Sequence, residues 1–187
     1  MPRHVVLVGL PGSGKSTVGR LAAARLGAPL FDIDSILVRQ MGRPVAQIFG
    51  MVGEAGFREM ERDAMNAASQ GPPSVIVPGG GWAAQPGHLE GARPSSIIIY
   101  LRCRPGVAVE RTEQGEQRPL LAGDPAGRMR ELLAAREPWY RLADYVVDSD
   151  RGSPEAVALE VVQLARAHGG WPPDSSPAAE GGAGPIR

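Results

Sequence analysis

The sequence predicts an α/β protein built around a five-stranded parallel β-sheet. Five short apolar runs, at residues 4–9, 28–34, 74–77, 96–101 and 144–149, are separated by segments with the spacing of amphipathic helices. Runs that lack internal alternation suit strands buried on both faces, which is the situation that βαβ crossovers create. A glycine-rich turn joins the first run to the first helical segment. We therefore expect one sheet with helices on both of its faces.

The first and last helical segments have recognisable ends. The first keeps helical spacing as far as Leu26, where Gly27 supplies a residue suited to a helix C-terminus. The last begins at Ser153, a good N-cap residue, with Pro154 in the first helical position. From residue 169 onward the chain is rich in Gly, Pro, Ser and Ala. We expect one domain over residues 1–168 and a largely disordered tail over 169–187.

The composition limits the classes of partner. Of the 187 residues, 20 are Lys or Arg and 20 are Asp or Glu, so no net charge attracts nucleic acid or an anionic membrane. No apolar run approaches the roughly twenty residues of a membrane span, and we expect no secretory leader. The single cysteine, Cys103, excludes an intrachain disulfide and suits packing near a strand end. We expect a monomer in the cytoplasm, without a nucleic-acid or membrane partner.

The stretch GLPGSGKST, residues 9–17, contains the one lysine of a chain whose other 19 basic residues are arginines. Gly9, four further residues and then Gly14-Lys15-Ser16 form the pattern of a phosphate-binding loop, here between an apolar run and a helix. In such a loop, backbone N–H groups converge on phosphate oxygens, and a compact ammonium fits between β- and γ-phosphates better than a guanidinium does. Ser16 would offer its hydroxyl to Mg²⁺. The plain alternative is a glycine-rich turn that has this spacing by chance.

Two carboxylates close the second apolar run. Asp32 and Asp34 stand in the stretch LFDID, and the period of a β-strand would turn both side chains the same way. One carboxylate would then reach the metal shell and the other an acceptor hydroxyl. The alternative is that one of them caps the helix that follows.

Charged residues share one face of the helix expected over residues 53–65. Glu54, Arg58 and Glu61 lie on this face. The apolar residues of another face are Met60, Ala64 and Ala67. Arg58 beside a carboxylate three positions away is either a solvated surface pair or part of a site.

Two further stretches are candidates for contact with a ligand. The stretch PGGGW, residues 78–82, follows a buried strand, and its glycines let backbone approach a ligand at the carboxyl end of the sheet. Its alternative is a flexible turn. Residues 111–123 are polar and suit a mobile cover that brings Arg118 onto a transferring phosphoryl group, or else an ordinary exposed loop.

Together these stretches resemble the shikimate kinase family. The motifs GLPGSGKST, FDID, IFGMVGEAGFREME, GGG, RPLLAG and REPWY occur in this order and cover about residues 4–166. The resemblance implies a three-layer α-β-α P-loop fold of the nucleoside-monophosphate-kinase type, with a substrate-binding segment near 33–62 and a lid near 112–124. It also implies transfer of the γ-phosphoryl of Mg²⁺-bound ATP to the 3-hydroxyl of shikimate, a step in aromatic amino-acid biosynthesis.

The resemblance assigns roles residue by residue. Catalysis is assigned to Lys15, Asp34 and Arg118. The residues assigned to ATP are Gly12, Ser13, Gly14, Lys15, Ser16, Thr17, Arg111, Arg118 and Pro154, with Arg111 and Pro154 bordering the adenine. The residues assigned to the acceptor are Asp34, Arg58, Gly79, Gly80, Gly81 and Arg136, and the positions that line or support this pocket are Phe49, Phe57 and Glu61. Ser16 and Asp32 are assigned to the Mg²⁺ shell.

The sequence departs from the family pattern around the triple glycine. Val77 and Pro78 precede it, where a small or hydroxylated residue is common two positions before the glycines, and the bulky Trp82 follows it. Trp82 either borders the acceptor pocket, where it would favour a different hydroxy acid, or packs locally with Pro86 and Leu89. The alternatives to a shikimate kinase are therefore a related kinase for another hydroxy acid and a nucleotide-binding module without transfer activity.

Overall fold

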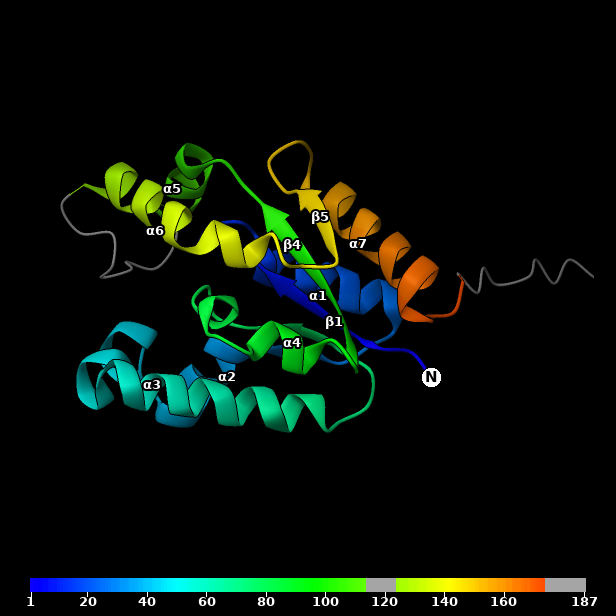
Figure 1. The fold of residues 1–187 in the computed structure, drawn as a ribbon, viewed down its shortest axis with the longest axis horizontal. Coiled ribbons are helices and arrows are strands. Elements are labelled where there is room, and N and C mark those ends of the chain that lie inside the picture. The colour runs from blue at the N-terminus through cyan, green and yellow to red at the C-terminus, as the bar shows by residue number, and fades with distance from the viewer. Residues whose placement is uncertain (114–123, 174–187) are drawn as a thin grey trace, which may run out of the picture.

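The computed structural model describes residues 1–113 and 124–173 and contains the predicted parallel sheet (Figure 1). Its strands are β1 (His4–Val8), β2 (Leu30–Asp32), β3 (Val75–Val77), β4 (Ser96–Arg102) and β5 (Tyr145–Asp148). They lie in the order β2-β3-β1-β4-β5, and all four neighbouring pairs are parallel. Each strand falls within or next to the apolar run that predicted it, so the predicted fold class is confirmed.

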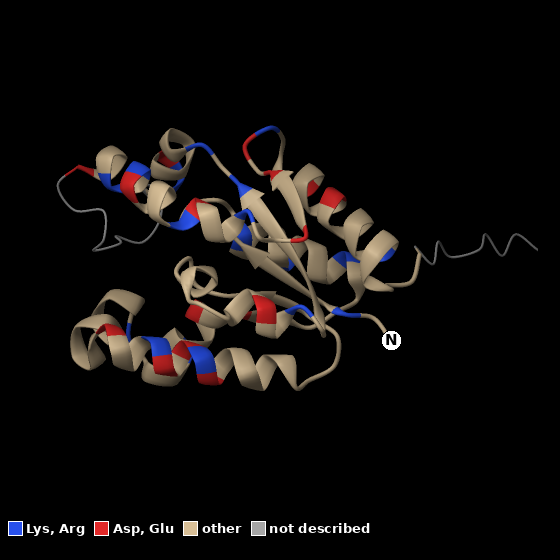
Figure 2. Cartoon of the chain, viewed as in Figure 1, with Lys and Arg blue, Asp and Glu red and all other residues tan. Residues whose placement is uncertain are grey.

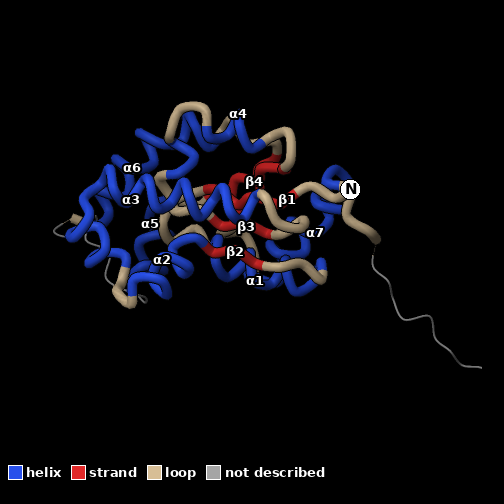
Figure 3. The backbone as a smooth tube through the Cα atoms, turned by 90° about the horizontal axis from the view of Figure 1, so that it is seen from below, coloured by secondary structure: helices blue, strands red, loops and turns tan. Residues whose placement is uncertain are grey.

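Helices cover both faces of the sheet and create two hydrophobic cores. Helices α1 (Lys15–Leu26) and α7 (Pro154–Gly169) pack on one face. The opposite face carries α2 (Ile33–Met41), α3 (Val45–Ser69), the short helices η1 (Trp82–Ala84) and α4 (His88–Ala92), α5 (Pro105–Glu113) and α6 (Pro125–Tyr140). Figure 3 shows α1 and α4 on opposite sides of the strands. This is the three-layer arrangement expected when every strand connection crosses over a helix.

The helix ends follow the local chemistry of the sequence. Gly27 ends α1, where its N–H donates to the carbonyls of Ala23 and Ala24. The Ser153 side chain caps α7 by accepting a hydrogen bond of 3.3 Å from the Ala156 N–H. Both predicted helix boundaries are therefore confirmed.

The ordered chain extends past the predicted domain boundary at residue 168. Trp171 is only 8% exposed and packs in the core on the α1 and α7 face. Its indole Nε1 donates a hydrogen bond of 2.9 Å to the Arg3 carbonyl, which ties this end of the chain to its beginning. The tail predicted from residue 169 is thus wrong for its first residues, and its later part, 174–187, lies outside the described residues.

Helix α3 carries charges of both signs. Figure 2 shows acidic and basic residues side by side along α3, in keeping with a chain that has equal numbers of each. Within residues 1–113 and 124–173, no helix combines the length and the apolar character that crossing a membrane requires.

Candidate active site

The loop between β1 and α1 is shaped to hold phosphate. Gly12 and Gly14 have φ values of 78° and 89°, which favour glycine, and Gly14 directly precedes the first residue of α1. The Lys15 ammonium lies inside the loop, where Nζ donates to the carbonyls of Gly9 at 3.0 Å and Leu10 at 2.8 Å. A positive charge and a helix N-terminus are therefore held at one point, which is what a polyphosphate requires.

The loop is packed against the elements behind it. A β-carbon placed on Gly9 would lie 2.6 Å from the Leu101 carbonyl oxygen, and one on Gly12 would collide with the Ala108 carbonyl of α5. Larger residues at these positions would push the loop away from β4 and α5. The position of the phosphate loop is thus fixed by backbone contacts that only glycine allows.

Arg111 bridges this loop and the segment that leads into α7. Its Nη2 donates to the Ser149 carbonyl at 3.0 Å, and its Nη1 would lie 3.8 Å from a β-carbon on Gly14. Pro154 opens α7 on the far side of the same segment. The structure therefore places Arg111 beside the phosphate loop.

Arg58 and Glu61 form an ion pair that is largely buried. Arg58 Nη1 lies 2.9 Å from Glu61 Oε2, and the Glu61 side chain is 1% exposed while that of Arg58 is 20% exposed. Burial raises the pKa of Glu61 above its ordinary value of 4.5, although the hydrogen bond and the charge of Arg58 oppose this shift. Arg58 Nε has no hydrogen-bond partner among the described residues. A solvated surface pair is therefore the wrong interpretation.

The triple glycine after β3 lies against this ion pair and against Asp34. A β-carbon on Gly79 would lie 2.5 Å from Glu61 Oε1 and 3.1 Å from Asp34 Oδ1. One on Gly81 would lie 2.5 Å from Arg58 Nη2. The loop can approach these side chains this closely only because it has none of its own.

Gly80 joins the two halves of the site. A β-carbon placed on it would lie 3.2 Å from Pro11 Cδ of the phosphate loop and 3.4 Å from Arg136 Nη1 of α6. Arg58 and Arg136 thus reach the same short loop from different helices. Two guanidinium groups with forked donors suit a small carboxylic acid, which they would hold directly beside the phosphate loop.

The two aspartates occupy different elements, which corrects the strand-based prediction. Strand β2 ends at Asp32, and Asp34 lies in the first turn of α2, so the two side chains do not share a strand face. Asp32 caps α2, because its Oδ1 accepts a hydrogen bond of 3.1 Å from the Ser35 N–H. The capping alternative is thus correct for Asp32, whereas Asp34 reaches the triple glycine from the helix.

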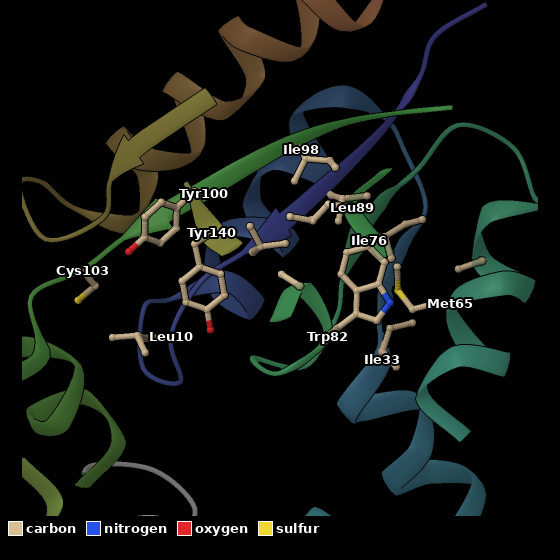
Figure 4. Close-up of a cluster of buried hydrophobic side chains, with 14 of the residues drawn as sticks. Leu10, Ile33, Met65, Ile76, Trp82, Leu89, Ile98, Tyr100, Cys103 and Tyr140 are labelled. Atoms are coloured by element: carbon tan, nitrogen blue, oxygen red, sulfur yellow. The ribbon is translucent and has the colours of Figure 1, made fainter. Parts of the chain in front are cut away.

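Trp82 belongs to the core beneath the glycine loop. It is 5% exposed and packs among Ile33, Met65 and Ile76 (Figure 4). Leu89 lies in the same cluster, whereas Pro86 is exposed and is not part of it, so the local-packing alternative is correct for Leu89 but not for Pro86. The indole is therefore a structural part of the floor below the site.

Val77, the other departure from the family pattern, faces the opposite core. Its Cγ2 methyl group would lie 2.7 Å from a β-carbon on Gly19 of α1. The larger side chain is accommodated because α1 presents a glycine at this point.

The other residues predicted to bind ATP differ in their exposure. Ser16 and Thr17 lie in the first turn of α1 with exposed side chains, and Ser13 is buried in the phosphate loop. Arg118 and most of the predicted lid lie outside the described residues.

Sequence reasoning gave no role to Tyr140, although this residue ends the REPWY motif. Its hydroxyl donates a hydrogen bond of 2.5 Å to the Gly80 carbonyl. Tyr140 stands four positions after Arg136, and this spacing puts both residues on one face of α6. That spacing was the available indication that both residues serve the same loop.

This arrangement defines a class of protein. A phosphate loop at the carboxyl end of a parallel sheet, with a second site for a small anion immediately beside it, is the design of a P-loop kinase that phosphorylates a small molecule.

Comparisons with known proteins identify the family. The family model for shikimate kinase matches residues 11–166. The chain is 42% identical over 170 residues to a shikimate kinase of Symbiobacterium thermophilum, which covers 89% of this chain and 98% of that protein. It is 40% identical over 162 residues to one of Caldanaerobacter subterraneus, covering 86% and 95%. The structure of shikimate kinase from Acinetobacter baumannii in complex with shikimate matches with a TM-score of 0.83 at 32% identity, covering 89% of this chain and 94% of that one. The chain belongs to the shikimate kinase family, and it is an ATP-dependent phosphotransferase.

Proposed function

We propose that this protein transfers the γ-phosphoryl group of ATP to the 3-hydroxyl of shikimate, using the site described above. The observation that carries the proposal is the position of Gly80, where the Arg136 guanidinium and the phosphate loop both come close to one residue. An acceptor held by Arg136 would therefore lie next to the transferring group. The relative from Acinetobacter baumannii, which is in complex with shikimate, supports the choice of acceptor.

The ATP side of the proposal rests on the phosphate loop. Backbone N–H groups of this loop and the Lys15 ammonium would hold the β- and γ-phosphates, and the proposed loop residues are Gly12, Ser13, Gly14, Lys15, Ser16 and Thr17. Arg111 and Pro154 would border the adenine. Because the transferring group is loosely bonded in the transition state, catalysis requires mainly positioning and charge neutralisation. Arg118, outside the described residues, is the proposed additional cation.

The acceptor side rests on the triple glycine and the side chains around it. Arg58 and Arg136 would bind the carboxylate of the acceptor, whose orientation their paired donors would fix. The backbone of Gly79, Gly80 and Gly81 would line the pocket. Asp34 would accept a hydrogen bond from an acceptor hydroxyl and align it with the γ-phosphate.

Mg²⁺ belongs to the proposal as the partner of ATP. Its candidate ligands, the Ser16 hydroxyl and an Asp32 carboxylate oxygen, are hard oxygen donors of the kind this ion prefers, and Asp32 caps α2 through Oδ1. Among the described residues, His, Cys, Asp and Glu form no group of three or more that could hold a metal. A Mg²⁺ ion bound mainly by phosphate and water needs no such group. When bound, the ion would neutralise charge on the phosphates.

The proposal extends to assembly and location. The proposed assembly is a monomer. A need for ATP as co-substrate fits the cytoplasm, and the balanced charge of the chain favours no nucleic-acid partner.

Calorimetric titration of the wild type and of Arg136→Ala with shikimate, and separately with ATP, tests the acceptor site. The matched control is Arg141→Ala, because Arg141 lies just after the same helix and forms an exposed ion pair with Glu137. We expect Arg136→Ala to weaken shikimate binding about tenfold or more, since a hydrogen bond to a charged group contributes roughly 1.5–3 kcal/mol. ATP binding should stay the same. A wild type that does not bind shikimate, or an Arg136→Ala variant that binds it normally, would overturn the proposal.

A further inference from the structure

Tyr140 ties the last residue of α6 to the triple-glycine loop. Its side chain is fully buried, and its hydroxyl donates a hydrogen bond of 2.5 Å to the Gly80 carbonyl. We propose that Tyr140 is a positioning residue for the acceptor, which acts by fixing Gly80 close to both Arg136 and the phosphate loop. This inference rests on the proposed function, because it assumes that the acceptor binds at Gly80 and Arg136.

The space around Gly80 shows why its position needs to be fixed. A β-carbon on Gly80 would lie 3.2 Å from Pro11 Cδ, and 3.4 Å from both the Gly9 carbonyl oxygen and Arg136 Nη1. A small shift of this peptide would therefore change the space between the acceptor and the phosphate loop. Because α6 carries both Arg136 and Tyr140, this one helix determines where the guanidinium lies relative to the glycine loop.

The hydroxyl of Tyr140 is a permanent donor. Burial raises the pKa of Tyr140 to about 12, although the charge of Arg136 and a hydrogen bond with it oppose this shift. The phenol thus keeps its proton at neutral pH, and the hydrogen bond to Gly80 does not titrate there.

The Tyr140 ring is itself held by packing. It lies against Tyr100 of β4, with ring centroids 5.1 Å apart and planes inclined by 33°. Figure 4 shows the two rings side by side with their hydroxyl groups pointing in different directions. Strand β4 of the sheet therefore supports the Tyr140 ring, and the Tyr140 hydroxyl in turn holds the glycine loop.

Tyr100 supplies a matched control. It is buried like Tyr140, but its hydroxyl has no hydrogen-bond partner in the part of the chain that the structure describes. Tyr100→Phe and Tyr140→Phe thus remove the same atom from neighbouring rings, and only Tyr140→Phe removes a hydrogen bond to Gly80.

The test is calorimetric titration of wild type, Tyr140→Phe and Tyr100→Phe with shikimate and with ATP. We expect Tyr140→Phe to raise the Kd for shikimate about three- to tenfold, the size of one neutral hydrogen bond, and to leave the Kd for ATP within about twofold. Tyr100→Phe should match the wild type for both ligands. The binding stoichiometry reports the folded fraction, so a loss of folded protein is distinguished from weaker binding.

Three results would overturn the inference. Unchanged shikimate affinity in Tyr140→Phe would show that the hydrogen bond does not position the acceptor. Equal weakening for ATP and shikimate would show that the hydroxyl serves the fold as a whole. A wild type that binds ATP but not shikimate would instead remove the proposed function, and this outcome is visible before any variant is measured.

Discussion

The Arg58–Glu61 pair connects stability and acceptor binding in a way that mutation can separate. Arg58→Ala leaves the Glu61 carboxylate in place with 1% exposure and without the guanidinium that lies 2.9 Å from it. Removing one partner of a buried ion pair costs about 3–5 kcal/mol, because the other charge is left uncompensated. Arg58 is itself 20% exposed, so water screens part of the interaction. We therefore expect a loss of about 3 kcal/mol, at the lower end of this range.

A second substitution separates the two consequences of losing Arg58. In Arg58→Ala/Glu61→Gln the stranded charge is gone, so we expect the double variant to regain about 2 kcal/mol relative to Arg58→Ala. The affinity for shikimate should stay low in both variants, because neither contains the guanidinium that would bind the carboxylate.

Urea unfolding at pH 7 and the KM for shikimate measure the two quantities. Arg62→Ala is the control, since Arg62 is an exposed arginine on the same helix and its replacement should change stability by less than about 0.5 kcal/mol. A double variant as unstable as Arg58→Ala would refute the explanation by a stranded carboxylate. A double variant with wild-type KM for shikimate would refute the contact between Arg58 and the acceptor.

Three further predictions test other parts of the site. Lys15→Ala should lower kcat by about 10²–10³, because a charge aimed at the transferring group is lost; a kcat near that of the wild type would exclude this role. Trp82→Ala should lower the free energy of unfolding by about 3–5 kcal/mol, since Trp82 is a buried core side chain; a loss below about 1 kcal/mol in urea unfolding would contradict that placement. The raised pKa of Glu61 means that the folded state holds this proton more tightly than the unfolded state. The wild type should therefore gain stability relative to Glu61→Gln as the pH falls from neutral through this pKa, which lies above 4.5. If the wild type instead lost stability relative to Glu61→Gln as the pH falls, the charge of Arg58 would outweigh the effect of burial on the pKa of Glu61.

The sheet and the phosphate loop were predictable because their causes are local. Uninterrupted apolar runs such as residues 96–101 have few alternatives to a buried strand. The spacing from Gly9 to Lys15 is typical of a phosphate-binding loop, which has to lie between a strand and a helix. The structure places both as expected.

The aspartates show where a local pattern misleads. The period of a strand was applied to both Asp32 and Asp34, but β2 has only three residues and passes into α2 without a gap. The Asp32 side chain caps the N-terminus of α2, and the alternation of a strand does not continue into this helix.

The buried face of α3 was only partly predicted, for a different reason. Met60, Ala64 and Ala67 were expected to form an apolar face. Met60 and Ala64 are half-buried and pack against the core, whereas Ala67 is exposed. The side chains of α3 that are buried are Ile48, Phe57, Glu61, Met65 and Ala68. Because Glu61 is charged, its position was not recognised as part of the buried face. Its burial depends on Arg58 and on the glycine loop, and the position of that loop follows only from the tertiary structure.

The role of Trp171 was not predicted because of the composition of the residues around it. The stretch after residue 168 reads as a polar linker by composition, although one indole in it fills a place in the core and bonds to Arg3. Average composition cannot detect a single anchoring residue.

The most direct test of the central claim is ADP release from Mg²⁺-bound ATP by the purified protein, with shikimate, with quinate, with gluconate and with no acceptor. We expect strong stimulation by shikimate alone, because Arg58, Arg136 and Asp34 lie around a glycine loop that comes close to the phosphate loop. ADP release that no acceptor stimulates, or that quinate or gluconate stimulates more strongly than shikimate, would contradict the account.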